Sequence, residues 1–444
     1  MKHKIMATLL LCGLLTGGNA QQPRVLQLTE ALELSVKNNK QLQLRKAQIE
    51  EATAAVQEAK EKKLPSASIS GAYMLLGNAN IDMAQKQGQS GNPSQEAPSP
   101  NQAMYGMFNV SQPLYAGGKI KYGILSAQYL QKATTLDAEN NLEEVLINTM
   151  ESFSNLYKAN TAVMLVKENL QQSRQRVKDF TAMEANGLLP RNDLLKAQLQ
   201  MSNVELSLLD AENNWAMANL NMNLLLGLPT GTILQPDTTG VEKRIDDRTL
   251  EQFTQLALSG RKDKAALGNR IDAALIAVKA VKADKIPTVS LTGGYVAAHI
   301  PDVISVTNAV NIGVGVSYNI ASLWKTAARE KQARSRVQQL QLNESILNDK
   351  IVQQVNQRYL SLLSQRKKID VMQKANEQAT ENYRIVQNKF NNQLATTTEL
   401  LEADVARLQA SLAYTLARAD AFVAYHQLLL STGNLSQTLN ISAK

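Results

Sequence analysis

A repeated stretch of sequence decides the fold: residues 63–73 read Lys-Leu-Pro-Ser-Ala-Ser-Ile-Ser-Gly-Ala-Tyr, and residues 285–295 read Lys-Ile-Pro-Thr-Val-Ser-Leu-Thr-Gly-Gly-Tyr. The two copies lie 222 positions apart. A second block repeats with a shift of 206 and ends at the pair Gly227 and Gly433. Because the register is kept throughout each block, the repeat indicates an internal duplication rather than chance similarity between helices.

Each half of the chain predicts the same succession of elements. A helix leads through a strand, a loop and a second strand into a very long helix, and after a turn a shorter helix returns. The expected bounds are 29–63 and 249–285, 66–76 and 288–297, 104–114 and 310–320, 119–185 and 324–390, and 192–226 and 398–432. The shifts differ by 16 residues, which places an insertion in the Asn-, Gln-, Gly-, Ser- and Pro-rich segment 77–100, an expected exposed loop.

The predicted strands alternate between two kinds of residue. In the fourth strand, Ile312, Val314 and Val316 share one face, while Gly313, Gly315 and other small or polar residues share the opposite face. A half-buried sheet alternates in the same way, but the small, uncharged face is typical of a wall around a water-filled lumen. Strands of about 10 residues also suit a tilted crossing of a membrane.

The element lengths predict a shape. A helix of about 67 residues spans roughly 100 Å, and two shorter helices laid end to end match it. The linker 228–248, the N-terminal segment and the tail after Gly433 should then meet near mid-height. The loops 77–103 and 298–309 should lie at the membrane end, with the turns 186–190 and 391–395 at the opposite tip.

Four strands cannot close a barrel, and lipid does not tolerate open sheet edges. Three copies would supply twelve strands, which is wide enough to conduct. The expected fold is therefore mainly α with a membrane β-barrel portion: helical hairpins form an α-barrel, and four strands per protomer join a shared 12-stranded barrel. The expected segments are a signal peptide at 1–20, repeats over 21–227 and 249–433, the equatorial linker 228–248 and a tail at 434–444.

The composition excludes several classes of function. The chain has 444 residues, 5% aromatic, with 47 basic and 39 acidic side chains and one cysteine. Two lysines, an apolar run and then Gly18-Asn19-Ala20 predict a cleaved signal peptide that contains Cys12. Attachment of a lipid to Cys12 is the less favoured alternative. The mature chain would lack thiols, and its two histidines, His299 and His426, lie outside any metal-ligand pattern. We therefore expect no enzyme, no metal and no cofactor.

The charge and hydropathy of the mature chain limit its partners further. Loss of two signal-peptide lysines lowers the formal charge from +8 to +6. We expect this mild charge to be spread out, so nothing favours nucleic acid as a partner. After the signal, no apolar run approaches the roughly 18–20 residues of a membrane-spanning helix, so any crossing must use strands.

Several motifs in this order resemble those of the TolC-like outer-membrane efflux proteins. They are Leu64-Pro65-Ser66 before the first strand, Gln112-Pro-Leu-Tyr-Ala-Gly-Gly-Lys119 before the long helix, Gly187-Leu-Leu-Pro-Arg-Asn-Asp-Leu-Leu195 at the turn, and Leu226-Gly-Leu-Pro229. Singly they are weak, but their spacing covers the mature chain. In the second half, residues 319–325 lack the Pro and the Gly-Gly pair, and Gln393 and Ala395 stand where the family commonly has glycine and often a basic residue. A gating network built on that basic residue is therefore not expected.

The resemblance implies a homotrimer in outer-membrane lipid with its helices in the periplasm. It also implies a passive conduit that docks to a periplasmic adaptor, or membrane fusion protein. Beyond the adaptor would lie an inner-membrane pump of the RND, ABC or a similar class, or a secretion transporter. The sequence does not reveal the exported substrate or the class of pump.

Acidic residues near the predicted tip are candidates for a constriction that selects ions. Asp193 and Glu399 are repeat equivalents in the first turns of the returning helices, and Glu402 lies one turn further on. Acidic residues also stabilise a helix N-terminus, and Glu399 completes a capping box with Thr396. No cap requires Glu402, so a place in the constriction and a merely stabilising role near the helix N-terminus both stay open for Glu402.

The tip turns and the strand aromatics complete the candidate residues. Leu188 and Leu189, which we expect to be exposed, suggest docking of an adaptor, although packing between protomers would also explain them. The candidate docking residues are Gly187, Leu188, Leu189, Pro190, Asn392, Gln393 and Leu394. The candidate aromatic girdles of the membrane interfaces, which could instead be ordinary strand packing, are Tyr73, Phe108, Tyr295 and Tyr318.

Two other classes of protein remain open at this point. A periplasmic coiled-coil binding protein without a pore would place charges on one face of every strand, and these strands have none. An exported enzyme would need a metal, nucleophile or phosphate-loop arrangement, and the sequence offers none.

Overall fold

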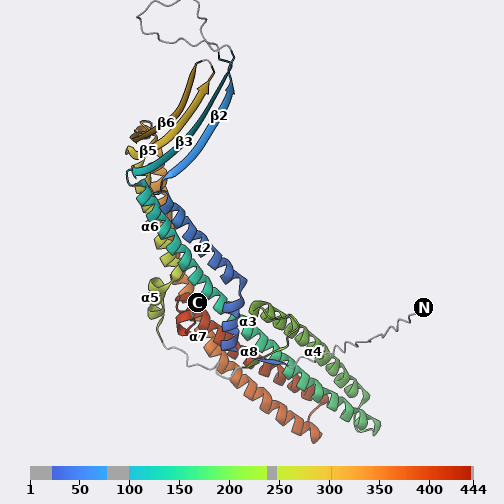
Figure 1. Ribbon diagram of the computed structural model, residues 1–444. Helices are drawn as coiled ribbons and strands as arrows, with labels where there is room; N and C mark the ends of the chain where they lie inside the picture. Colours follow the sequence, from blue (N-terminus) through green and yellow to red (C-terminus); the bar gives the residue numbers. More distant parts are fainter. Residues whose placement is uncertain (1–22, 78–99, 238–247, 302, 442–444) are drawn as a thin grey trace, which may run out of the picture. The chain divides into compact units, whose positions relative to one another are not determined.

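The structure is a computed structural model that describes residues 23–77, 100–237, 248–301 and 303–441 (Figure 1). Its described residues fall into two compact units. Unit 1 combines residues up to 40, 142–260 and 353 onward, and unit 2 combines 41–141 and 261–352. The expected signal peptide, the insertion 78–99, part of the linker (238–247) and the last residues of the tail lie outside the described residues.

The same order of elements occurs twice along the chain. The first series is β1 (Arg24–Gln27), α1 (Leu28–Asn38), α2 (Lys40–Glu61), β2 (Ser66–Leu75), β3 (Gln102–Tyr115), α3 (Lys119–Ala185) and α4 (Arg191–Leu226). The second is β4 (Leu234–Asp237), α5 (Leu250–Gly260), α6 (Lys262–Ala283), β5 (Thr288–Ile300), β6 (Ile304–Ser317), α7 (Ser322–Asn391) and α8 (Thr397–Ser431), followed by α9 (Leu435–Thr438). The four-strand and long-helix pattern predicted from the sequence is confirmed, and α3 has the predicted bounds.

The leading helix of each half is interrupted, so the expectation of single helices over 29–63 and 249–285 is wrong. Asn39 separates α1 from α2 with ψ near 122°, and Arg261 separates α5 from α6 with ψ near 128°. Backbone in this extended region cannot continue the helical hydrogen-bond ladder. The two breaks are 222 positions apart, which is the shift of the sequence repeat.

The second hairpin of the sheet has a shorter loop than expected. Strand β5 runs to Ile300 and β6 begins at Ile304, so most of the expected loop 298–309 belongs to strands. The register shifts between Val296 and Ala298, and Asn308 adopts a positive φ of 58°. Such an irregularity hides the strand periodicity on which the sequence prediction depended.

The four long strands of unit 2 form one antiparallel sheet in the order β2-β3-β5-β6 (Figure 1). Cross-strand pairs such as Ser66 with Ser111 and Thr288 with Ser317 align the strand ends that adjoin helices. The four connections to helices therefore all lie at the same end of the strands. Strands β2 and β6 are outermost, and each has one side without a partner strand among the described residues.

A second, two-stranded sheet ties the N-terminal segment to the linker in unit 1. Strand β1 pairs in parallel with β4, beginning with Arg24 opposite Leu234. Leu26 and Leu234 are buried there together with Phe153 of α3 and Met222 of α4. The pairing agrees with the expectation that the N-terminal segment and the linker meet, and the tail binds α3 nearby through a 2.5 Å hydrogen bond from Ser436 Oγ to Glu143.

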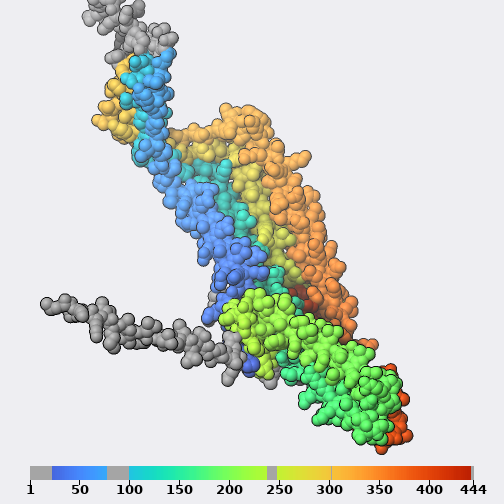
Figure 2. All heavy atoms as spheres, turned by 90° about the vertical axis from the view of Figure 1, so that its right-hand side faces the viewer, coloured from blue at the N-terminus to red at the C-terminus, as the bar shows by residue number. Residues whose placement is uncertain are grey.

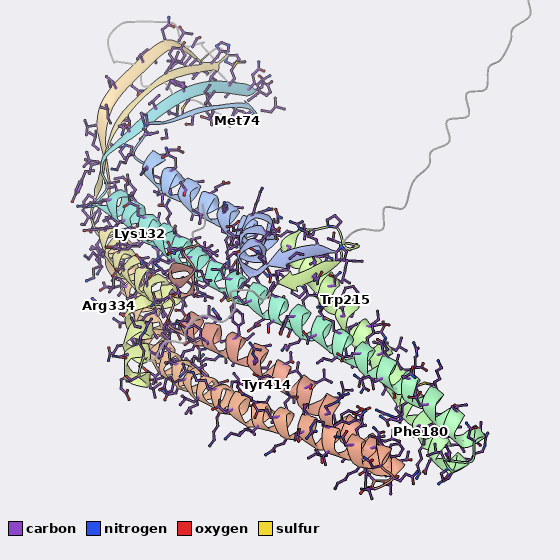
Figure 3. The ribbon with its side chains drawn as sticks, turned by 90° about the horizontal axis from the view of Figure 1, so that it is seen from below. Met74, Lys132, Phe180, Trp215, Arg334 and Tyr414 are labelled. Carbon is purple, nitrogen blue, oxygen red and sulfur yellow. The ribbon has the colours of Figure 1, made fainter. Side chains whose placement is uncertain are left out.

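In unit 1, polar contacts connect α3 to both α4 and α8, and α8 to α7 (Figure 3). Arg174 of α3 pairs with Glu205 of α4 at 3.0 Å, and Lys158 of α3 pairs with Asp420 of α8 at 3.0 Å. Ser411 of α8 then donates a 2.8 Å hydrogen bond to α7. Near the tip α4 also reaches α8 through Lys196 and Thr398, whereas α4 and α7 share no hydrogen bond or ion pair among the described residues.

Candidate functional site

One face of the four-stranded sheet is apolar and uncovered. The paired register places on this face a set of large side chains that are 37% to 85% exposed: Ile69, Tyr73, Leu75, Met104, Phe108, Leu291, Tyr295, Val310, Ile312, Val314 and Val316. An exposed apolar surface of this extent is not stable in water and marks contact with another apolar phase or partner. The alternation predicted for these strands is confirmed.

The opposite face of the sheet is built mainly from small and polar residues. It carries Ser66, Ser68, Ser70, Asn109, Ser111, Ser290, Thr292, Gly294, Asn311, Gly313, Gly315 and Ser317, with Met74, Tyr105 and Met107 nearer the loop end. At Gly294 an added Cβ would stand 2.6 Å from the carbonyl oxygen of Phe108, so this position requires glycine. The strands contain no Asp, Glu, Lys or Arg. This face therefore offers water a polar but uncharged wall.

The aromatic candidates share the apolar face of the sheet but do not lie at one level. Phe108 and Tyr295 are direct cross-strand partners in the middle of the sheet. Tyr73 lies near the loop end, where its hydroxyl donates a 2.7 Å hydrogen bond to Gln102. Tyr318 follows the last residue of β6, at the helix end. The four residues thus mark three heights rather than a single ring.

The tip of unit 1 has its own hydrophobic core, which joins both helical hairpins. Phe180, labelled in Figure 3, stacks on Phe390 with ring centroids 5.4 Å apart. Leu189 packs into this core and is only 9% exposed, so the expectation that Leu189 is exposed is wrong. The turn directs Leu189 inward because the chain must cover the ends of α3 and α4, whereas Leu188 remains 69% exposed.

The other candidate docking residues lie in the two exposed tip turns. Gly187 has a φ of +71°, and nothing lies within 4 Å of the position its Cβ would take. Gln393 adopts a positive φ of 62° without being glycine, and its neighbour Leu394 is 76% exposed. Pro190 precedes α4 as its N-cap residue, and Asn392 is exposed at the end of α7. The turns thus present Leu188 and Leu394 as their apolar projections.

The three acidic candidates have different surroundings. Asp193 accepts a 3.1 Å contact from Lys196, whose ammonium also reaches Thr398 of α8 at 3.3 Å. Glu399 completes the predicted capping box, and the hydrogen bond from the Thr396 backbone N–H, followed by that from its hydroxyl, lowers the pKa of Glu399. Glu402 is exposed, and its carboxylate has no hydrogen bond or ion pair with other described residues. Of these three acidic residues, only Glu402 has a carboxylate without a partner among the described residues.

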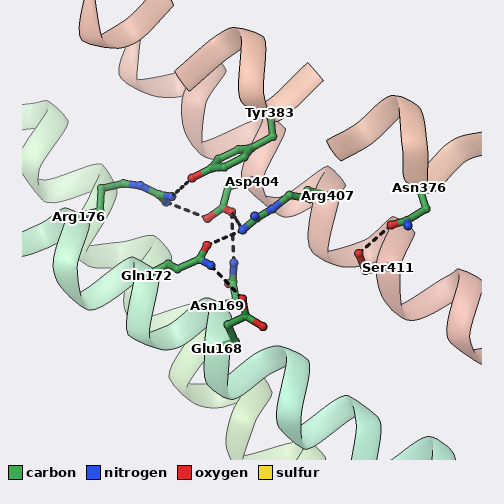
Figure 4. A network of polar contacts seen from close by, with 9 residues as sticks. All are labelled: Glu168, Asn169, Gln172, Arg176, Asn376, Tyr383, Asp404, Arg407 and Ser411. Carbon is green, nitrogen blue, oxygen red and sulfur yellow. Dashed lines mark hydrogen bonds and ion pairs between the residues drawn. The ribbon is translucent and has the colours of Figure 1, made fainter. Parts of the chain in front are cut away.

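A buried polar network lies further along the hairpins and was missed by the sequence analysis (Figure 4). Asp404 of α8 is 3% exposed and accepts a 2.9 Å bond from Arg176 of α3 and a 3.0 Å bond from Arg407. Arg176 also donates to the hydroxyl of Tyr383 on α7 at 3.2 Å, and the Arg407 guanidinium lies 4.2 Å from the centroid of the same ring. The network therefore connects α3, α7 and α8 within one chain.

A signal for this network does exist in the sequence. Thr397, Leu400 and Asp404 recur three and four residues apart on the buried side of α8, and Arg176 follows Leu170 and Ser173 in the same way on α3. Charged residues at such positions must be paired, because an isolated buried charge is too costly. Periodicity alone did not reveal which residues pair.

Helix α4 carries a second apolar stripe besides the one that it buries. Six apolar residues at spacings of three, four, seven or eight share one side of the helix and are 51% to 65% exposed: Leu195, Leu199, Leu206, Leu209, Met217 and Leu224. We call them the α4 seam. In the space-filling view α4 lies at the surface of unit 1 in light green (Figure 2). Helix α7 exposes Leu360, Leu363, Val371 and Ile385, which also share one side of their helix.

The described residues contain no group of three or more His, Cys, Asp or Glu side chains arranged to hold a metal ion. In the same part of the chain, no helix is both long enough and apolar enough to span a bilayer.

Comparisons with known proteins agree on one family. The family model for outer membrane efflux protein matches residues 31–228 and 253–434. A curated relative, the outer membrane efflux protein BepC of Brucella suis biovar 1 (strain 1330), is 23% identical over 449 residues, which cover 98% of this chain and 91% of the relative.

Solved structures share the fold. The Campylobacter jejuni CmeC outer membrane channel matches with a TM-score of 0.75 at 16% identity, covering 92% of this chain and 86% of the other. The open state of the Neisseria gonorrhoeae MtrE outer membrane channel matches with a TM-score of 0.72 at 14% identity, covering 91% and 88% of the two chains.

Proposed function

Because the chain belongs to the outer membrane efflux protein family, we propose that three copies form the outer-membrane exit duct of a tripartite efflux or type I secretion system. The family consists of channel proteins rather than enzymes. In this proposal the sheet lies in the outer membrane, the helices extend into the periplasm, and solutes pass without a chemical step.

One observation carries the proposal: a single sheet combines an apolar exposed face, a small uncharged face and two unpaired edges. In lipid, each unpaired N–H or C=O costs several kcal/mol, on the order of the penalty for burying any unsatisfied polar group. Pairing the β2 edge of each copy with the β6 edge of the next removes that cost. Three copies then supply twelve strands, with the small residues facing the lumen.

The helical layer supports the same arrangement. Helices α4 and α7 each expose apolar residues along one side, at spacings close to multiples of a helical turn, as in knobs that pack into holes. If the α4 seam of one copy packs against α7 of the next, three layers close into a twelve-helix tube. A trimer is therefore consistent with the closure of both the sheet and the helical layer.

At the tip, Glu402 is the best candidate for a charge in the conduction path, because Asp193 and Glu399 are engaged by Lys196 and Thr396. Three copies would place Glu402 carboxylates in a ring that favours cations. Leu188 and Leu394 would meet the hairpins of a periplasmic adaptor, which connects the duct to an inner-membrane pump of the RND, ABC or a similar class.

The assembly is tested with the full-length chain expressed in a Gram-negative host. We expect heat-modifiable trimers in the outer-membrane fraction and discrete channels in planar bilayers. Neutralising Glu402 (Glu402→Gln) should lower cation selectivity, while Glu212→Gln, which changes an exposed acid on α4 away from the tip, serves as the control. Monomers confined to the soluble periplasmic fraction would overturn the proposal, and unchanged selectivity would exclude the Glu402 ring alone.

The docking surface needs a separate test. Leu188→Asp combined with Leu394→Asp should abolish efflux while trimers still insert, because a charge at the tip opposes an apolar contact. Gln171→Asp on α3 combined with Thr380→Asp on α7 adds the same two charges at exposed positions away from the turns and from the α4 seam. Efflux unaffected by the tip variant would show that the adaptor binds elsewhere.

A further inference from the structure

The positive charge of the chain is concentrated where the helices of unit 2 meet the sheet. The strand–helix links, together with ten residues of each adjoining helix, are 52–65, 116–128, 274–287 and 318–331. These ranges hold eleven Lys or Arg and four acidic residues, a net charge of +7, whereas the whole chain carries +8. The expectation of a spread-out charge is wrong.

We call the eleven cationic side chains the basic collar. Its members are Lys60, Lys62, Lys63, Lys119, Lys121, Lys279, Lys282, Lys285, Lys325, Arg329 and Lys331. The register of the sheet brings them together, because Ser66 pairs with Ser111, Tyr115 with Val289, and Thr288 with Ser317. All four helices therefore adjoin the same end of the strands, each within a few residues of its strand.

The acidic residues of these ranges are already occupied. Asp284 accepts contacts from Lys119 at 2.7 Å and Arg329 at 3.1 Å. Glu330 lies within 4 Å of three cations, Lys282, Lys285 and Arg334. The side-chain ammonium groups of six members of the collar have no partner among the described residues: Lys60, Lys63, Lys121, Lys279, Lys325 and Lys331. The collar therefore presents an excess of positive charge that this chain does not neutralise.

An apolar and aromatic band lies at the same end of the strands, beside the basic collar. Its exposed members are Leu64, Leu114, Tyr115, Ile286, Tyr318, Ile320, Leu323 and Trp324. Tyr115 pairs with Val289 and so belongs to the apolar face, and Trp324 is 64% exposed directly before Lys325. Trp and Tyr beside lysines is the composition of a membrane–water interface, where rings lie at the level of the headgroups.

From these observations we propose that the basic collar binds the phosphates of anionic phospholipids in the leaflet that faces the helices. The inference rests on the proposed function, which places the apolar face in the outer membrane. The occupant is a lipid rather than free phosphate, because the neighbouring band provides an apolar surface for acyl chains. Each lysine close to an anionic surface strengthens binding about fivefold, and added salt screens this attraction.

The test uses the purified full-length trimer in detergent, titrated with phosphatidylglycerol or with phosphatidylcholine of the same chains and followed by native mass spectrometry. We expect the wild type to bind phosphatidylglycerol at least tenfold more tightly. Replacing three unpartnered collar lysines (Lys63→Gln, Lys121→Gln and Lys325→Gln together) should remove most of this preference. Inorganic phosphate in large excess should not compete.

A matched control removes the same charge elsewhere. Lys350, Lys367 and Lys374 on α7 are exposed and have no partner among the described residues. Their replacement by glutamine should leave the lipid preference intact. If both triple variants lose it equally, net charge rather than the collar is responsible and the inference is wrong. If the collar triple does not assemble, the three single variants decide, each with about a fivefold loss expected.

Two further outcomes separate this inference from the proposed function. A wild type that forms conducting trimers but binds both lipids equally overturns the collar alone. A collar variant with unchanged lipid preference but altered ion selectivity would place these lysines in the lumen and also overturn it. A chain that forms neither trimers nor channels removes the proposed function itself.

Discussion

The sheet of unit 2 and the helical tip of unit 1 bury their residues in opposite ways. In the tip core and the polar network beside it, one chain supplies both sides of each contact: Phe180 stacks on Phe390, and the carboxylate of Asp404 accepts hydrogen bonds from two guanidinium groups. On the sheet, the largest apolar residues face outward, and Ile312 is 82% exposed. The tip core is buried by residues of a single chain. The sheet, in contrast, has an uncovered apolar face and two edge strands without partner strands.

This difference indicates what each region depends on. The stability of the tip is a property of one chain, so tip substitutions should appear in the unfolding of that chain. The sheet depends on lipid and on further copies, so sheet substitutions should appear in insertion and assembly. Four predictions test the distinction, in order of decreasing effect.

A charge on the apolar face of the sheet should have the largest effect. Ile312→Arg places a guanidinium in lipid at a cost of about 2–4 kcal/mol per copy, which three copies multiply. We expect heat-modifiable trimers to disappear from the outer-membrane fraction. Asn311→Arg, one residue away on the small-residue face, should insert normally; equal loss in both variants would contradict the assignment of the two faces.

Removal of the buried carboxylate at the tip should have the next largest effect. Asp404→Ala leaves two guanidinium groups without their partner, which costs about 3–5 kcal/mol in the free energy of unfolding. Denaturant unfolding of the purified protein measures this loss. Asp420→Ala, which breaks the more exposed pair with Lys158, provides the comparison and should cost about 1 kcal/mol or less.

The α4 seam should respond like the sheet although it is helical. Leu206→Ala should weaken the association of copies by about 2 kcal/mol per copy, because the leucine is exposed in one chain and becomes buried only between chains. Dissociation of detergent-solubilised trimers during mild heating reports the change. Asn203→Ala, outside the seam on the same helix, should have no measurable effect.

The smallest effect should come from the cap of α8, and it should depend on pH. The pKa of Glu399 lies below its ordinary value of 4.5, because the backbone N–H and the hydroxyl of Thr396 donate hydrogen bonds to the charged carboxylate in the folded state. The carboxylate therefore stabilises the fold above about pH 4.5, and this contribution disappears as the pH falls through the lowered pKa. Glu399→Gln should unfold more easily than the wild type at pH 7, with the difference vanishing in acid.

Sequence reasoning recovered the elements whose periodicity is strong and local. The bounds of α3 and the faces of the strands follow from spacings of three and four or of two. The break at Asn39 was missed because Asn39 is neither glycine nor proline and ψ at one residue leaves no trace in a hydrophobic pattern. The break at Arg261 did have a local signal, Gly260 directly before it, but one glycine within a helical pattern does not by itself indicate an end. Leu189 was misplaced because a tip turn gives no period from which burial can be deduced.

The Asp404 network shows a different limit. Its members come from positions more than 200 residues apart, as with Arg176 and Asp404. Such pairs depend on which helices become neighbours, and that arrangement is set by the packing of α3 against α8. Local spacing can indicate that a charged residue is buried, but only the three-dimensional arrangement identifies its partner.

The open edges of β2 and β6 also have a consequence for the speed of maturation. A chain that must find its strand partners on other chains completes its fold through molecular encounters, whose frequency depends on concentration. If three copies are needed, the early rate at which finished channels accumulate should rise more steeply than in proportion to the amount of chain in transit. Halving expression would then delay maturation as well as reduce the yield, and the half-made sheet would spend longer open to aggregation and proteolysis.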